Sequence, residues 1–181
     1  MYEIEVADNQ DDMTVSAERV TDVVRKALTA EQVASATISV AIVDSTTMLE
    51  LNRQFLNHDY ETDVLSFLLD ESEPETGSKL ANMAPRGAGR TIDGEIIVSA
   101  AYAREMAAEY DWAPEYELTL YIVHGLLHLC GYDDMTADEL PVMRARECDI
   151  FRLLKLPPPV RSSDDMGHVS ATAASESGGP L

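Results

Sequence analysis

The segment His124-Gly-Leu-Leu-His-Leu-Cys-Gly-Tyr-Asp-Asp134 decides how the C-terminal half of this sequence folds. The apolar residues before and between its histidines predict a buried helix, and Pro114 is well placed in the first turn of that helix. Gly131 predicts the helix end, because glycine readily adopts the left-handed backbone conformation that follows a helix. A helix followed by a tight turn brings the residues after the turn back toward the helix.

The two histidines of this segment have the spacing of metal ligands. His124 and His128 are four residues apart, so both imidazoles project from one helix face. Two nitrogens placed in this way can reach one ion at about 2.0–2.1 Å. The turn at Gly131 can add the carboxylate of Asp133 or Asp134, and three protein ligands leave a position for water, as in catalytic sites. The alternative is that both histidines are ordinary core or surface residues.

One residue argues against a metallopeptidase. In the His-Glu-x-x-His peptidases, the glutamate beside the first histidine is the general base. Here that position is Gly125, which has no side chain to accept a proton from a metal-bound water. Glycine at this position also leaves space that a bulky polyanionic substrate could use.

Apolar patterns outward from this segment predict the remaining elements. Strands are predicted at 2–6, 37–43, 64–69 and 92–98, and helices at 15–28, 47–55, 99–110, 114–131 and 136–156. The first helix places one apolar stripe toward the core, made of Val20, Val23, Val24, Ala27 and Leu28. Helix starts are indicated by a possible cap at Ser99 and by two capping-box pairs, Thr47 with Glu50 and Thr136 with Glu139.

This order of elements predicts an α+β fold in a single domain, residues 1–157. We expect a small mixed four-stranded sheet packed with about five helices, and a metal site at a helix-turn. The strands at 64–69 and 92–98 are predicted to pair as a hairpin across a loop from Asp70 to Arg90. After three consecutive prolines, residues 158–181 are rich in Ser, Ala and Gly and are predicted to be a disordered tail.

Composition limits the function. The 181-residue chain has a formal net charge of −20, which argues against broad, tight binding of nucleic acid by this chain alone and favours a protein or ribonucleoprotein partner. No apolar stretch approaches a membrane span, and the acidic N-terminus has no signal-peptide core, so a cytoplasmic protein is expected. Cys130 and Cys148 fit that compartment as unpaired residues and are predicted to be small buried apolar side chains.

Three motifs in the same order resemble the bacterial YbeY family of metal-dependent endoribonucleases. They are Thr-Asp-Val-Leu-Ser-Phe at 62–67, Gly-Glu-Ile-Ile-Val-Ser at 94–99, and His-Gly-x-x-His-Leu-x-Gly-Tyr-Asp at 124–133. The resemblance implies an α+β fold, one zinc ion per chain and cleavage of single-stranded RNA. It also implies a role in late 16S rRNA 3′-end maturation and ribosome quality control, with single-stranded rRNA and the small ribosomal subunit or ribosome-associated proteins as partners.

The family alignment also implies the ligand set His124, His128 and Asp134. The family usually has a third histidine at the position of Asp134. A carboxylate still binds zinc, but two histidines and one carboxylate also suit Fe, Mn or Ni. Asp133 is the alternative third ligand, or a hydrogen-bond acceptor for a ligand imidazole. Glu95 is a further candidate for that acceptor role, with a plain strand position as the alternative.

A second departure concerns phosphate binding. The family has an arginine where this sequence has Leu56, and Leu56 cannot bind a phosphate. Arg53 or His58 could substitute, although each is equally explained as a solvated surface residue. Asp63 and Ser66 are weaker candidates for lining the cleft.

No catalytic side chain is assigned beyond the metal-bound water. Two alternatives to an RNA enzyme stay open at this point. The chain could be a metal-dependent hydrolase of a non-RNA substrate, or a ribosome-associated factor whose metal is structural. Leu56 and the acidic net charge give the second alternative its weight.

Overall fold

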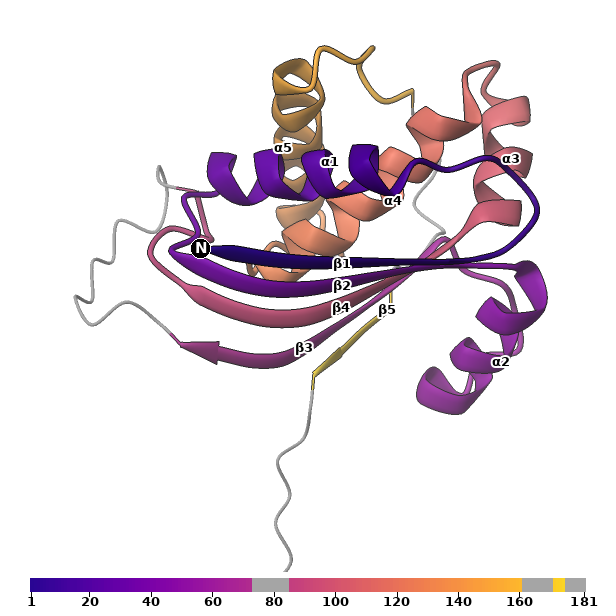
Figure 1. Cartoon of the computed structure of the whole chain (residues 1–181), viewed down its shortest axis with the longest axis horizontal. Helices are drawn as coiled ribbons and strands as arrows, with labels where there is room; N and C mark the ends of the chain where they lie inside the picture. The colour runs from indigo at the N-terminus through magenta and orange to yellow at the C-terminus, as the bar shows by residue number, and fades with distance from the viewer. Residues whose placement is uncertain (73–84, 161–170, 175–181) are drawn as a thin grey trace, which may run out of the picture.

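A mixed β-sheet runs through the protein, with helices on both faces (Figure 1). The computed structural model describes residues 1–72, 85–160 and 171–174. The strands are β1 (Tyr2–Asn9), β2 (Ser35–Val43), β3 (Val64–Ser72), β4 (Thr91–Ser99) and β5 (Ala171–Ala174). The helices are α1 (Ala17–Ala30), α2 (Ser45–Leu56), α3 (Ala100–Glu109), α4 (Pro114–Leu129) and α5 (Glu139–Leu153). The order from β1 to α5 and the α+β class are those predicted from the sequence.

The strand order in the sheet is β1-β2-β4-β3-β5. β1 pairs with β2 and β2 with β4 in parallel, whereas β3 and β4 form the predicted antiparallel hairpin. β3 continues to Ser72, beyond the predicted start of the loop at Asp70, because Asp70–Ser72 pair with the first residues of β4 after a bulge at Leu69. Most of the predicted loop, residues 73–84, lies outside the described residues.

The sheet has one strand more than the four predicted. β5 pairs in parallel with Leu65–Leu68 of β3 and lies within the segment predicted as a tail. Without it, β3 would be an edge strand with unpaired backbone groups, which any extended segment can satisfy through its main chain. The four residues Ala-Thr-Ala-Ala carry no apolar alternation that would have indicated a strand. Residues 161–170 and 175–181 lie outside the described residues, so the disordered tail and the domain boundary at 157 stay predictions.

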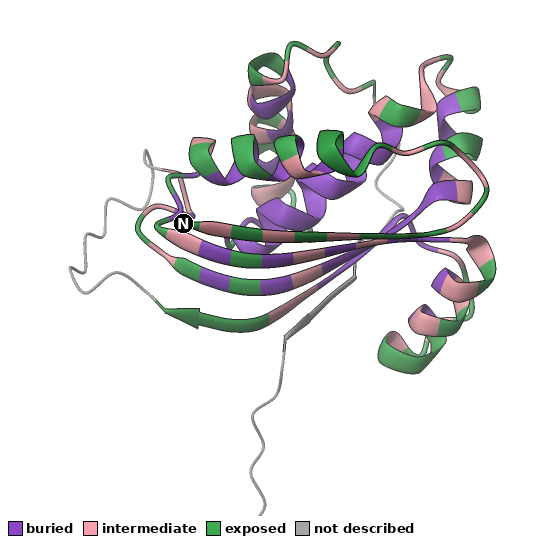
Figure 2. Cartoon of the chain, in the orientation of Figure 1, coloured by how far each residue is buried: buried purple, intermediate pink, exposed green. Residues whose placement is uncertain are grey.

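The main core lies between the sheet and the helices α1, α3, α4 and α5 (Figure 1). The buried residues of α1 are the five predicted, and Figure 2 shows burial alternating along the central strands. α4 is different, because every residue from Glu117 to Leu129 is buried. A helix buried on all sides must satisfy each of its polar side chains inside the protein.

The capping predictions are confirmed in part. Ser99 caps α3 by accepting a hydrogen bond from the backbone N–H of Tyr102, and Pro114 occupies the first turn of α4. α2 is capped instead by Asp44, whose carboxylate accepts from the backbone N–H of Thr47 at 2.7 Å. Aspartate is as good a cap as threonine, and placing the cap three residues earlier adds a turn to the helix.

α4 packs closely on the sheet at Gly94 of β4. A Cβ atom on Gly94 would lie 2.7 Å from Cδ1 of Leu129 and 3.2 Å from the carbonyl oxygen of Phe67. The missing side chain therefore allows the end of α4, next to His128, to lie directly on the strand.

Gly94→Ala should lower the free energy of unfolding by about 1–3 kcal/mol, because the added methyl group overpacks this contact. Urea denaturation measures the effect as a lower midpoint with an unchanged slope. An unchanged midpoint would show that Leu129 can move aside and that the close approach is not required.

Candidate metal centre

α4 and the turn after it place three ligand groups around one point. His124 and His128 are both buried, and their Nε2 atoms are 3.0 Å apart. Oxygens of Asp134 lie 3.4 Å from Nε2 of His124 and 3.6 Å from Nε2 of His128. In the described part of the chain, these three residues form the one cluster whose ligand atoms, all within 4.8 Å of one another, could hold a metal ion.

The turn that brings Asp134 back depends on Gly131. This residue has a φ of +94°, which favours glycine, and it directly follows Cys130, where α4 is capped. The backbone N–H of Tyr132 then donates to the carbonyl of Leu127, which closes the turn against the helix. The predicted helix end and the predicted return of the chain are therefore both observed.

The two candidate aspartates, Asp133 and Asp134, differ in their hydrogen-bond partners. Oδ1 of Asp133 accepts hydrogen bonds from the backbone N–H groups of Asp134 and Met135, at 2.8 and 3.2 Å, so this side chain stabilises the turn. Oδ1 of Asp134 is buried without a hydrogen-bond partner. A buried carboxylate oxygen without a partner is costly unless a cation binds it. The geometry therefore favours Asp134 over Asp133 as the third ligand.

Both imidazoles are oriented by hydrogen bonds at Nδ1. Nδ1 of His124 lies 2.6 Å from Oε1 of Glu147 on α5, and Nδ1 of His128 lies 3.0 Å from the carbonyl oxygen of Tyr132. Donation from Nδ1 to these oxygens leaves the Nε2 lone pairs directed at the shared point. Such partners fix the tautomer and raise the basicity of a ligand imidazole.

Glu147 was not predicted from the sequence, in which Glu95 was a candidate for this acceptor role. Glu147 is 1% exposed and lies 23 residues from His124, so no local spacing connects the two. The available signal was weak, since Met143, Glu147 and Ile150 lie on one apolar face of α5, where a carboxylate is unusual. Glu95 lies on β4 opposite Phe67 and forms no hydrogen bond with either imidazole.

The pKa values of His124, His128 and Asp134 depend on one another. Burial lowers the pKa of His124, but hydrogen bonds to Asp134 and Glu147 outweigh it and raise the pKa to about 9. Burial and repulsion from His124 lower the pKa of His128. Burial raises the pKa of Asp134, but the hydrogen bond and positive charge of His124 outweigh this effect, so that the pKa is lowered overall. A metal ligand must be a neutral imidazole, so binding of an ion would displace the proton that these carboxylates favour on His124.

Most of the chain matches one family of known proteins. Residues 5–155 match the family model described as Endoribonuclease YbeY. The chain belongs to the endoribonuclease YbeY family. This membership confirms the resemblance drawn from the three motifs and the predicted class of enzyme, an endoribonuclease.

Relatives named Endoribonuclease YbeY cover most of the chain. The Salinibacter ruber protein is 38% identical over 138 residues, which are 76% of this chain and 82% of the relative. The Halalkalibacterium halodurans protein is 35% identical over 152 residues, 82% of this chain and 93% of the relative. The solution structure of TM1509 from Thermotoga maritima has a TM-score of 0.51 at 21% identity, covers 86% of this chain and 92% of its own, and supports the fold alone.

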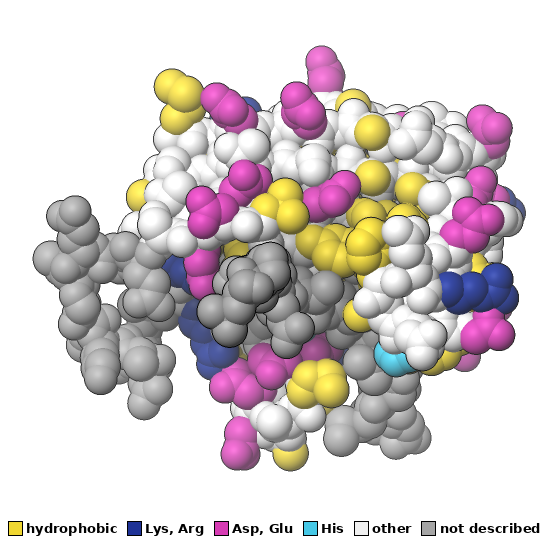
Figure 3. All heavy atoms as spheres, turned by 90° about the horizontal axis from the view of Figure 1, so that it is seen from below, with side chains coloured by type: hydrophobic (Ala, Val, Ile, Leu, Met, Phe, Trp, Pro, Cys, Tyr) yellow, Lys and Arg dark blue, Asp and Glu magenta, His cyan; other side chains and the backbone are white. Residues whose placement is uncertain are grey.

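The side chain at the position of the family arginine belongs to an apolar cluster. Leu56, at the end of α2, packs against a small core on the sheet face opposite α4 that includes Met48 and Leu65. Acidic side chains lie across this face around exposed apolar side chains (Figure 3). Arg53 pairs with Asp59, and neither Arg53 nor His58 contacts a candidate ligand.

The weaker candidates have structural roles. Oδ1 of Asp63 accepts from the backbone N–H of Val64 and the hydroxyl of Thr62, so Asp63 fixes the start of β3 while its charge raises the pKa of His124. The hydroxyl of Ser66 is buried in β3 without a partner. The space at Gly125 is not open to substrate, because a Cβ atom there would lie 3.0 Å from side-chain carbons of Ile96 and Val64.

Cys130 is buried as predicted, whereas Cys148, also predicted to be buried, is only partly buried. Both cysteines are free, and burial raises the pKa of the Cys130 thiol far above its ordinary value. No helix in residues 1–72 and 85–160 has the length and hydropathy to cross a bilayer.

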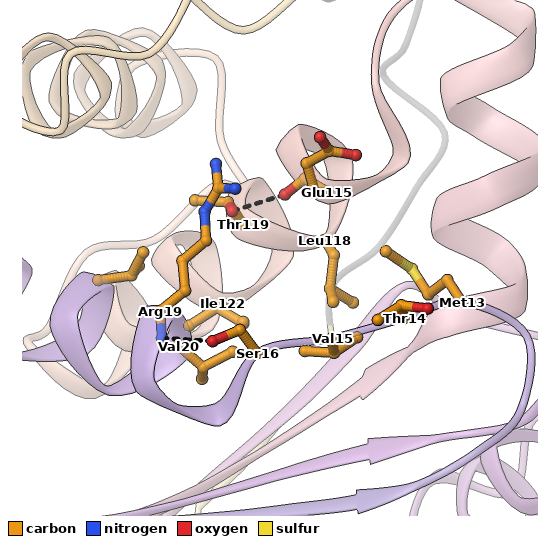
Figure 4. A pocket seen from close by; sticks show the side chains of 11 residues that line it. Met13, Thr14, Val15, Ser16, Arg19, Val20, Glu115, Leu118, Thr119 and Ile122 are labelled. Carbon is orange, nitrogen blue, oxygen red and sulfur yellow. Dashed lines mark hydrogen bonds between the residues drawn. The ribbon is translucent and has the colours of Figure 1, made fainter.

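A pocket between the start of α1 and the first turns of α4 contains Arg19, Glu115 and Thr119 but none of the candidate ligands (Figure 4).

A buried ion pair supports the metal-binding turn from behind. Glu31, which is fully buried, accepts from Nε of Arg146 at 2.5 Å and from the hydroxyl of Tyr132 at 3.4 Å. Arg86 stacks over the Tyr132 ring and donates to the carbonyl of Gly131 at 3.1 Å. α1, α5 and residues 85–90 therefore all hold the turn that carries Asp134.

Arg146→Met should destabilise the protein by about 3–5 kcal/mol, because Glu31 would stay buried without its cation. Chemical denaturation of the variant measures the loss. The double variant Glu31→Met/Arg146→Met should recover most of it, since no charge is then left unpaired. Equal stability of Arg146→Met and the wild type would contradict a buried pair.

Glu147→Gln should weaken metal binding about 10–100-fold, because a neutral amide polarises His124 less than a carboxylate does. Titration against a competing chelator measures this affinity. Glu105→Gln, the same chemical change at an exposed position of α3, is a matched control. Similar affinities for both variants and the wild type would exclude a role of Glu147 at the metal centre.

Proposed function

We propose that this chain is a metal-dependent endoribonuclease that cleaves single-stranded RNA with one zinc ion bound by His124, His128 and Asp134. The observation that carries the proposal is the convergence of the three ligand groups around a buried, unpartnered oxygen of Asp134. Such an oxygen and two oriented imidazoles form the three-ligand donor set that, in catalytic zinc sites, leaves a position for water. Fe, Mn and Ni suit the same donors.

We further propose a place of action. The substrate is the 3′ end of 16S rRNA in late maturation and ribosome quality control, in the cytoplasm and with the small ribosomal subunit or its proteins as partner. Family membership supports this role, and the net charge of −20 supports a partner that delivers the RNA.

The chemistry divides between the ion and the chain. When bound, the ion lowers the pKa of a water ligand and so provides a nucleophile near neutral pH. Glu147 and the Tyr132 carbonyl hold the two imidazoles in the required tautomer. Asp134 brings a negative charge against both imidazoles, and Asp133 keeps the turn closed. The chemical nature of the product ends identifies the nucleophile, because attack by the RNA 2′-hydroxyl would leave a 2′,3′-cyclic phosphate.

The decisive test compares two neighbouring substitutions with the same change in charge. Asp134→Asn should lower metal content well below one ion per chain and lower RNA cleavage by at least about 100-fold, since loss of a ligand exceeds loss of a ligand's partner. Asp133→Asn should keep both, because its side-chain oxygen still accepts the turn hydrogen bonds. Metal analysis of untagged protein and cleavage of a single-stranded 16S rRNA 3′-end fragment provide the two measurements.

Other results of these measurements would support one of the two alternative functions. Metal without cleavage of any single-stranded RNA in the wild type would favour a hydrolase of another substrate or a ribosome-associated factor with a structural metal. Leu56 in place of the family arginine is the observation that favours the second of these. Ribosome co-sedimentation that survives His128→Ala in a folded protein would then identify the binding factor. Wild type without metal would refute the central proposal.

A further inference from the structure

Arg144 of α5 lies beside the metal centre and is connected to it by a buried carboxylate. Its Nη1 lies 3.3 Å from Oε2 of Glu147, whose other oxygen is bonded to Nδ1 of His124. Among the described basic residues, Arg144 alone has a carboxylate partner that is hydrogen bonded to a candidate ligand. Its positive charge also acts on Asp134.

Most other arginines and lysines of the described ranges are paired elsewhere. The pairs are Lys26 with Asp22, Arg53 with Asp59, Arg86 with Glu139, Arg90 with Glu71, Arg104 with Asp12, Arg146 with Glu31 and Arg152 with Asp149. None of these carboxylates is bonded to His124 or His128. These seven cations of the described ranges are therefore engaged at the surface and at the Gly131 turn.

The guanidinium of Arg144 keeps donors free for a ligand. An arginine has five N–H donors, and the bond to Glu147 uses only one nitrogen of Arg144. No nitrogen of Arg144 is buried without a partner, and its side chain is 28% exposed. A guanidinium presents its remaining N–H groups in the planar arrangement that suits a phosphate, and the charge of Arg144 acts on Asp134.

The charges around the centre explain why a cation is needed there. Four carboxylates, those of Asp63, Asp133, Asp134 and Glu147, act on the two imidazoles. A phosphodiester that approaches this site meets these negative charges. A fixed guanidinium beside them offsets part of the repulsion and stabilises charge that develops on the phosphate.

We infer that Arg144 is a substrate-binding residue, whose guanidinium holds a phosphate of single-stranded RNA beside the metal centre. This inference rests on the proposed endoribonuclease function. It assigns to α5 the phosphate contact that Leu56 cannot make and that neither Arg53 nor His58 is placed to make next to a ligand.

The test measures RNA binding, salt dependence and metal content together. The probe is a short fluorescent 2′-O-methyl oligoribonucleotide, titrated with purified holoprotein at several salt concentrations. Arg144→Gln should weaken binding about tenfold, the loss of one hydrogen-bonded charge. It should also reduce the slope of log affinity against log salt by about 0.7, the value for one phosphate of a single strand.

Two further variants separate phosphate binding from other effects. Arg144→Lys should restore the salt slope, because the positive charge returns. Arg152→Gln removes the same charge from the same helix at an exposed position and should bind as the wild type does. All three variants should keep the wild-type metal content, because neither arginine is a ligand.

Three results would overturn the inference. A salt slope for Arg144→Gln equal to that of Arg152→Gln, in a protein whose wild type cleaves RNA, removes the phosphate contact and leaves the proposed function intact. Loss of metal with an unchanged slope shows that Arg144 acts only through Glu147, as a positioning residue. A wild type that neither binds nor cleaves single-stranded RNA refutes the proposed function, and this inference with it.

Discussion

Complete burial of α4 is the constraint on which the metal centre depends. The helix lies between the sheet and three other helices, so the imidazoles of His124 and His128 are enclosed in an otherwise apolar interior. Their Nδ1 atoms are satisfied by Glu147 and by the Tyr132 carbonyl. Two Nε2 atoms and one oxygen of Asp134 are left facing one another. A cation at that point satisfies all three at once, whereas a core of neutral groups cannot.

The same constraint explains why several contacts fix the position of the short turn that carries Asp134. A ligand on a turn is useful only if the turn keeps its position to within a fraction of an ångström. Here Gly131 supplies the backbone conformation, Asp133 closes the turn from its own side chain, and the pair of Glu31 and Arg146 supports Tyr132 from behind. The ion pair connects α1 to α5, so stability of the helical layer and geometry of the metal centre depend on the same contacts.

The sequence predicted what local patterns determine. Apolar periodicity identified the buried face of α1, and the four-residue spacing of the histidines identified one face of α4. It could not predict contacts between distant segments. Glu147 reaches His124 only because α5 packs on α4, and β5 exists only because β3 offers an open edge. Gly125 shows the same limit, since its role depends on Ile96 and Val64, which no pattern within α4 indicates.

An acidic net charge is compatible with an RNA substrate, because salt screens charges that lie far from the site. At physiological ionic strength, exposed charges farther apart than about 8 Å are largely screened from one another. Most of the net charge of −20 therefore has little effect at the candidate metal centre, where the carboxylates around the imidazoles and Arg144 act on the candidate ligands. An enzyme of this kind needs few phosphate contacts at the reacting bond. Few phosphate contacts would also mean weak binding to RNA in general, which is compatible with the proposed action on RNA that a partner presents.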